Sequence, residues 1–106
     1  MQVLFDQGTP VPLRQFLPHH SIRTAFELGW SALKNGELLA RAEAEGFEAL
    51  VTTDRNLKYQ QNLADRRIAI VVLSTTSWPR IQANVSLVLQ AIDAAKPGGY
   101  AEVQIP

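Results

Sequence analysis

The feature that most constrains the fold of this chain is an uninterrupted run of six apolar residues, from Ile68 to Leu73. A strand with one face in solvent alternates apolar and polar residues, whereas a continuous apolar run is typical of a strand that is covered on both faces. Such strands occur in parallel sheets, where each crossover connection lays a helix on one face. The run therefore predicts an interior strand of an α/β protein.

The rest of the chain alternates strand-like and helix-like segments without an intervening linker or repeat. Further strands are expected at 3–6, 21–28, 49–53 and 100–105. Helices are predicted between the strands. The first runs from Pro10 to Leu17 and is capped by Thr9, and the second is capped by Asn35 and stopped by Gly46. A short polar helix or loop is expected at 56–63, and a long helix is expected to begin near Pro79 and to end before Pro97. This alternation predicts a three-layer α/β fold: a mostly parallel five-stranded sheet with helices on both faces, in the common strand order 2-1-3-4-5.

Composition narrows the class of protein. The chain has 106 residues, 46% of them hydrophobic, and no cysteine, which fits one globular domain over residues 1–106 and excludes a disulfide scaffold or a thiolate metal site. Ten basic residues balance ten acidic ones, which argues against a uniformly positive nucleic-acid binder. No apolar stretch is long enough to span a membrane, and the first residues lack a signal-peptide pattern. We therefore expect a cytoplasmic protein without a membrane partner.

Two of the predicted strands lead directly into an aspartate, Asp6 and Asp54. In the order 2-1-3-4-5 these strands are neighbours, so their carboxyl ends would place both side chains at one edge of the sheet. Paired carboxylates repel each other unless a divalent cation or a shared proton relieves them, and Mg²⁺ or Mn²⁺ prefers such oxygen ligands. Glu37, at a predicted helix start, is a third candidate ligand. Each acid also has a structural interpretation, as a turn or cap residue or as a complement to the helix dipole.

Other site patterns are weaker. Glu27 lies at the exit of the second predicted strand and is another candidate ligand, but pairing with Arg23 or with a helix residue is the favoured interpretation. The glycines fit neither of the phosphate-binding loop patterns, and no serine has the context of a hydrolase nucleophile. The aspartate pair therefore carries the functional argument.

Three segments together carry a resemblance to a known family. They are Val3-Leu4-Phe5-Asp6, Asn35-Gly36-Glu37-Leu38-Leu39-Ala40 and Leu50-Val51-Thr52-Thr53-Asp54-Arg55-Asn56-Leu57. In order and spacing the chain, over roughly 1–75, resembles the short PIN-like proteins, bacterial proteins regarded as nucleases and often found as toxin components of toxin–antitoxin pairs. The resemblance implies a metal-dependent endoribonuclease in which Asp6, Glu37 and Asp54 form a carboxylate cluster for Mg²⁺ or Mn²⁺. Arg55 and Lys58 would then steer the RNA backbone, and an antitoxin protein or a second copy of the chain would be a partner.

Two departures from the family pattern open alternatives. Asn35 and Asn56 stand where the family usually has acids, and an amide ligates Mg²⁺ without neutralising its charge, so metal affinity should fall. One alternative is therefore a non-catalytic PIN-like interaction module with a degenerate metal site. A receiver-like signalling domain shares the strand order and would use Asp54 as the phosphate acceptor. Receivers, however, carry an acidic pair near the first strand, where this chain has Asp6 alone.

Overall fold

A five-stranded parallel sheet is the frame of the part of the chain that the structure describes, which is residues 1–57, 63 and 65–106 of a computed structural model. The strands are β1 (Gln2–Phe5), β2 (Ser21–Thr24), β3 (Ala49–Thr52), β4 (Ala69–Leu73) and β5 (Tyr100–Val103). Their order is β2-β1-β3-β4-β5, and every neighbouring pair is parallel. The predicted α/β class and the order 2-1-3-4-5 are confirmed.

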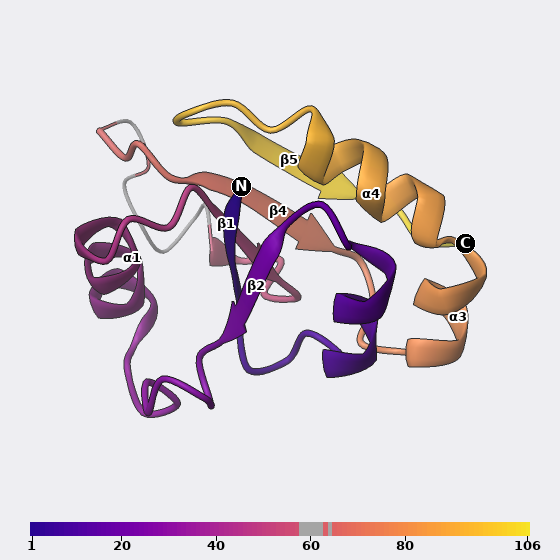
Figure 1. Cartoon of the computed structure of the whole chain (residues 1–106), viewed down its shortest axis with the longest axis horizontal. Helices are drawn as coiled ribbons and strands as arrows, with labels where there is room; N and C mark the ends of the chain where they lie inside the picture. The colour runs from indigo at the N-terminus through magenta and orange to yellow at the C-terminus, as the bar shows by residue number, and fades with distance from the viewer. Residues whose placement is uncertain (58–62, 64) are drawn as a thin grey trace.

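Helices cover both faces of the sheet (Figure 1). The helices described are the 3₁₀ helix η1 (Val11–Phe16) and the α-helices α1 (Asn35–Ala44), α3 (Trp78–Ala83) and α4 (Val85–Asp93). Val3 and Phe5 of β1 belong to a buried cluster with residues of η1, α3 and α4, while Leu4 between them belongs to a second cluster with residues of α1. Successive strand side chains point to opposite faces, so the two clusters lie on the two sides of the sheet. The expected three layers are present.

The apolar run that predicts an interior strand forms β4. All of its residues are buried, and it lies between β3 and β5. Val71 belongs to the cluster under α4, and Ile70 and Val72 belong to the cluster under α1. Each face of β4 therefore packs against a helical layer, which is why neither face carries a polar residue.

Helix α1 ends as the sequence predicts. Gly46 has a φ of +85°, a left-handed conformation that residues with a Cβ rarely adopt, and its N–H donates to the Glu43 carbonyl at 3.1 Å. The next residue, Phe47, donates to the Ala42 carbonyl at 2.9 Å. These two hydrogen bonds end α1 and direct the chain into β3. The start of α1 differs by one residue from the prediction, because Lys34 occupies the cap position and Asn35 is the first helical residue.

Several elements are shorter than the sequence predicts. The strand expected at 21–28 stops at Thr24, and the strand expected at 100–105 stops at Val103. The helix expected from Pro10 to Leu17 is the 3₁₀ helix η1, and the long helix expected from Pro79 is split at Asn84 into α3 and α4. The Asn84 side chain donates to the Arg80 carbonyl at 2.9 Å, and asparagine commonly competes in this way with helical hydrogen bonds. The polar helix or loop expected at 56–63 falls mostly on residues 58–62, which lie outside the described residues.

No helix among the described residues is long and apolar enough to cross a membrane.

Candidate functional site

Asp6 and Asp54 lie at the carboxyl-terminal edge of two adjacent strands. Phe5 pairs with Val51 in the β1–β3 ladder, and the Asp6 N–H continues the pairing by donating to the Val51 carbonyl at 2.9 Å. Asp6 therefore sits beside Thr52, the last residue of β3, and Asp54 follows two residues later. Neighbouring parallel strands end at the same edge, so residues 48 positions apart in the chain come together there, as predicted.

The Thr52 hydroxyl links the two aspartates. It donates to Asp6 Oδ2 at 2.8 Å and accepts from the Asp54 N–H at 3.1 Å. The Thr52 residue is only 1% exposed, so water does not compete for its hydroxyl. The hydroxyl therefore fixes the carboxylate of one strand against the backbone that carries the other carboxylate.

Asn35 completes a chain of hydrogen bonds at this edge. From the first turn of α1, its side-chain amide donates to Asp54 Oδ2 at 2.8 Å, and the Asn56 N–H donates to Asp54 Oδ1 at 3.0 Å. We call this group the aspartate site, and it consists of Asp6, Thr52, Asp54 and Asn35. Asn35 thus lies at the position where the family resemblance places an acid.

The loop after β1 is anchored to β3 by a buried threonine. The Thr9 hydroxyl donates to the Val51 carbonyl at 2.9 Å, and the Thr9 N–H donates to the Asp6 carbonyl at 3.0 Å. The sequence predicts Thr9 as a helix cap, and this is wrong, because Pro10 is at the cap position of η1 and Thr9 is used across the sheet. Gly8 approaches Thr53 so closely that an added Cβ would lie 2.4 Å from Thr53 Oγ1.

The remaining predicted site residues are less closely associated. Glu37 is exposed in the first turn of α1, and Arg55 is exposed directly after Asp54. Lys58 lies outside the described residues. Within residues 1–57, 63 and 65–106, no three or more His, Cys, Asp or Glu side chains form a group that could hold a metal, so Glu37 does not complete a three-carboxylate group with the two aspartates here.

The chemistry of the donors nevertheless fits a hard cation. The Gln7 N–H donates to Asp6 Oδ1 at 2.7 Å, so among the described residues each of the four aspartate oxygens receives one hydrogen bond. A carboxylate has about four lone-pair sites, so each oxygen keeps capacity for a further ligand. Mg²⁺ usually keeps several waters and binds through one or two carboxylates together with substrate phosphates. Asp6 and Asp54 fit that requirement without a third acid.

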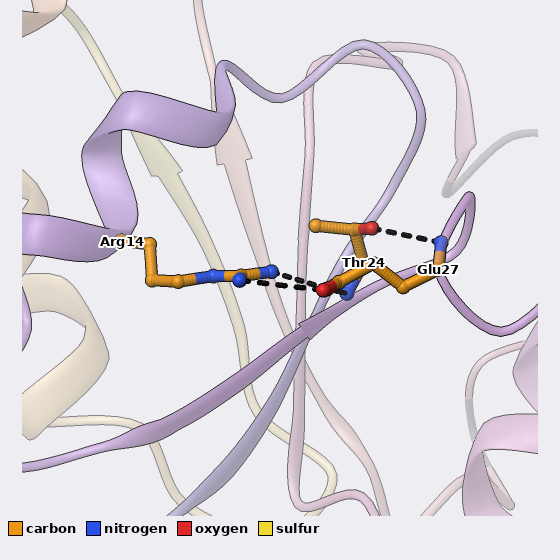
Figure 2. A network of polar contacts seen from close by, with 3 residues as sticks. All are labelled: Arg14, Thr24 and Glu27. Carbon is orange, nitrogen blue, oxygen red and sulfur yellow. Dashed lines mark hydrogen bonds and ion pairs between the residues drawn. The ribbon is translucent and has the colours of Figure 1, made fainter.

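A pocket of about 370 Å³ opens on the other side of Asp6. We call it the Arg14 pocket, and its lining residues are Asp6, Gln7, Thr9, Val11, Arg14, Thr24, Phe26 and Glu27. In Figure 2 the Arg14 side chain reaches from η1 to the Glu27 carboxylate, and Thr24 lies beside the same carboxylate. The pocket therefore shares one residue, Asp6, with the aspartate site.

Reciprocal hydrogen bonds hold Glu27 in place. The Thr24 N–H donates to Glu27 Oε1 at 2.9 Å, and the Glu27 N–H donates to the Thr24 hydroxyl at 3.0 Å. This is the arrangement of a capping box, and it ends β2 by winding the chain into a turn. The hydrogen bond from Arg14 and then that from the Thr24 N–H lower the pKa of Glu27 below its usual range. The favoured prediction that Glu27 pairs with another residue is confirmed, with Arg14 of η1 as the partner.

The sequence predicts neither the pairing of Arg14 with Glu27 nor the exposure of Phe26. Nothing local links Arg14 and Glu27, which are 13 residues apart. Phe26 falls within the strand expected at 21–28, whereas it lies in the turn after β2 and is 78% exposed. The spacing Thr24-x-x-Glu27 is the signal that could have predicted the turn.

Comparisons of this chain with protein-family models, with curated proteins and with solved structures found no match.

Proposed function

We propose that the protein is a metal-dependent endoribonuclease that hydrolyses RNA phosphodiester bonds. The observation that supports this most is the aspartate site, where Asp6 and Asp54 meet at the edge of adjacent parallel strands. Ligands of open α/β sheets bind outside the carboxyl ends of the strands, where the winding of the sheet reverses. Between β1 and β3 the winding reverses in this way, and both strands end beside these aspartates.

The residues of the site have distinct roles in this proposal. Asp6 and Asp54 hold one or two Mg²⁺ or Mn²⁺ ions, and Glu37 joins them through ordered water or through movement of its exposed side chain. The chemistry supplied by the bound ion is activation of a water and stabilisation of charge on the scissile phosphate. Thr52 orients Asp6, and Asn35 orients Asp54.

Basic residues after the site would position the substrate. Arg55 is exposed and adjacent to Asp54, so it can meet a backbone phosphate without desolvating a buried charge. Lys58 has the same role in this proposal. As the family resemblance implies, the enzyme would act in the cytoplasm as the toxin of a toxin–antitoxin pair, with an antitoxin protein or a second copy of the chain as partner.

The decisive experiment is cleavage of single-stranded RNA by the purified protein with Mg²⁺, Mn²⁺ or EDTA. Cleavage should require the metal and should be lost in Asp6→Asn and Asp54→Asn, because removal of one carboxylate loosens the ion and misplaces the water. Asp65→Asn is the matched control, since Asp65 is exposed and precedes β4 at the opposite edge of the sheet. Cleavage that survives Asp54→Asn, or a wild-type protein without activity on any RNA, would contradict the proposal.

The substrate contacts need a separate measurement. Arg55→Ala and Lys58→Ala should weaken RNA binding and reduce its dependence on salt, because each removes a phosphate contact and no metal ligand. Circular dichroism should show an unchanged fold. A salt dependence equal to that of the wild type would remove both residues from the proposed interface.

A non-catalytic interaction module is the second candidate. The absence of a three-carboxylate group among the described residues favours it, as does the amide at Asn35. Thermal melts separate the two candidates, because an ion that binds only the folded state stabilises it by RT ln(1 + [L]/Kd), about 2.7 kcal/mol at one hundred times Kd. Equal melting temperatures in Mn²⁺ and EDTA would favour the module.

A further inference from the structure

The Arg14 pocket has an exposed aromatic side chain at its wall. Phe26 is 78% exposed, and among the described residues it is the most exposed of the large hydrophobic side chains. Val11, which is 55% exposed, lines the same pocket. An aromatic face left in solvent beside an apolar neighbour is suited to stacking on a flat ring of a ligand.

The polar wall of the pocket is built and held in place. Arg14 and Glu27 pair with each other, and Glu27 is fixed by two reciprocal hydrogen bonds with Thr24 (Figure 2). Arg14 Nη1 and Nη2 each donate one hydrogen bond to Glu27, and each keeps a second N–H. The Arg14 side chain is 36% exposed and lines the pocket, so these N–H groups can donate to an acceptor of a ligand.

The charge of the pocket selects against an anion inside it. Arg14 and Glu27 neutralise each other, which leaves the Asp6 carboxylate as the remaining charge of the wall. A phosphate group would be repelled from this interior unless a cation accompanied it at Asp6. The interior therefore suits a neutral, flat group that carries hydrogen-bond acceptors.

The size of the pocket fits one such group. Its volume of about 370 Å³ lies at the lower end of the range for small-molecule sites, which is roughly 300–1,000 Å³. A single nucleobase with its ribose is of this size, whereas a duplex would have to expose a base from its stack to reach the pocket.

We infer that the Arg14 pocket binds one unpaired nucleobase of a single-stranded RNA, with Phe26 stacking on the base and Arg14 donating to an acceptor on its edge. Because Asp6 borders both the pocket and the aspartate site, the phosphate next to that nucleotide would then lie at the two aspartates. This inference rests on the proposed function. It adds that cleavage occurs beside an unpaired nucleotide whose base is held by the segments that follow β1 and β2.

The test is binding of a fluorescently labelled hexaribonucleotide in EDTA, measured by anisotropy, so that cleavage cannot interfere. Phe26→Ala should weaken binding about 5- to 150-fold, the range expected for loss of one base–aromatic stack. Phe26→Tyr keeps the ring and should bind within about twofold of the wild type. Leu87→Ala is the control, because Leu87 is an exposed apolar residue of α4 outside the pocket.

Competition identifies the source of the base. A nucleoside monophosphate that displaces the hexamer only at concentrations far above the hexamer Kd supports an RNA chain as the ligand. A monophosphate that binds as tightly as the hexamer, and depends equally on Phe26, would overturn the RNA assignment in favour of a free nucleotide. The inference is also overturned if Phe26→Ala binds the hexamer like the wild type, or if the wild type binds it neither in EDTA nor with Ca²⁺, a cation that can offset the charge of the two aspartates.

Failure of this inference can be told apart from failure of the proposed function. A protein that shows Phe26-dependent binding in EDTA but never cleaves RNA with Mn²⁺ has the base site and lacks the nuclease activity. A protein that cleaves RNA with Mn²⁺, with a KM unaffected by Phe26→Ala, has the activity and lacks the base site. Because Phe26 is mostly exposed, Phe26→Ala should also leave the melting temperature unchanged.

Discussion

Replacement of Thr52 by valine should test whether one hydroxyl organises the aspartate site. Valine has nearly the same shape, so no cavity forms, but two hydrogen bonds are lost, one to Asp6 Oδ2 and one from the Asp54 N–H. A hydrogen bond to a charged group is worth about 1.5–3 kcal/mol and a neutral one about 1 kcal/mol. Asp6 is partly exposed, so water replaces some of the first loss, and we expect the free energy of unfolding to fall by about 2 kcal/mol.

The assay is thermal unfolding in EDTA, followed by circular dichroism. With an unfolding entropy of about 2.1 cal/mol/K per residue, a chain of this length should lose about 9 °C in melting temperature for about 2 kcal/mol. Thr53→Val is the matched control, because the Thr53 hydroxyl makes no hydrogen bond with any described residue. If Thr52→Val melts within about 2 °C of the wild type, or if Thr53→Val is equally destabilised, the role assigned to the Thr52 hydroxyl is wrong.

Three further predictions follow from the same structure. Gly8→Ala should lower the free energy of unfolding by about 1 kcal/mol, because the new Cβ would lie 2.4 Å from Thr53 Oγ1 and only rotation of that hydroxyl relieves the clash. In urea unfolding, the double variant Gly8→Ala with Thr53→Ala should recover the lost free energy. A double variant as unstable as Gly8→Ala would contradict the contact. Asn35→Asp should lower the melting temperature in EDTA, since it replaces the donor 2.8 Å from Asp54 Oδ2 with a second negative charge. The same variant should be stabilised more by Mn²⁺ than the wild type is. Equal increases of the melting temperature in Mn²⁺ would argue against a metal at this position. Glu43→Gln should cost about 1–2 kcal/mol at pH 7. Burial raises the pKa of Glu43, but the hydrogen bonds from Arg66 and from the backbone lower that pKa by more. The stabilisation by Glu43 is therefore complete above the ordinary pKa of 4.5, and it is lost as pH falls through the lower pKa of the folded state. In urea unfolding, the difference in the free energy of unfolding between wild type and Glu43→Gln should therefore shrink from pH 7 to pH 3. A difference that stays constant would show that the stabilisation does not come from the ionised Glu43 carboxylate.

The sequence alone determined the sheet and the meeting of the two aspartates. The apolar run from Ile68 to Leu73 requires cover on both faces, and the β–α alternation leaves a parallel sheet as the simple solution. Given the common strand order, Asp6 and Asp54 had to end on neighbouring strands. These conclusions depend on local apolar periodicity and on the order of elements along the chain, and both can be read from consecutive residues.

The tertiary structure decided which polar side chains connect. Thr9 has the local pattern of a helix cap, yet its hydroxyl is used by the Val51 carbonyl, 42 positions away. Asn35 likewise has the local pattern of a cap, and its amide is used by Asp54, 19 positions away. Short-range propensity cannot rank such partners, because the competing acceptor is brought near only when the strands and helices pack.

The Arg14 pocket shows the same limit. A strand through Phe26 is a reasonable prediction from alternation, but the Thr24 and Glu27 hydrogen bonds stop the strand, and the ion pair with Arg14 holds the resulting turn against η1. The local signal for the turn was present in the spacing of Thr24 and Glu27, whereas the partner of Glu27 came from another element. A pocket is a shape enclosed by several elements, so it exists only once the chain has folded, and no segment of the sequence contains it.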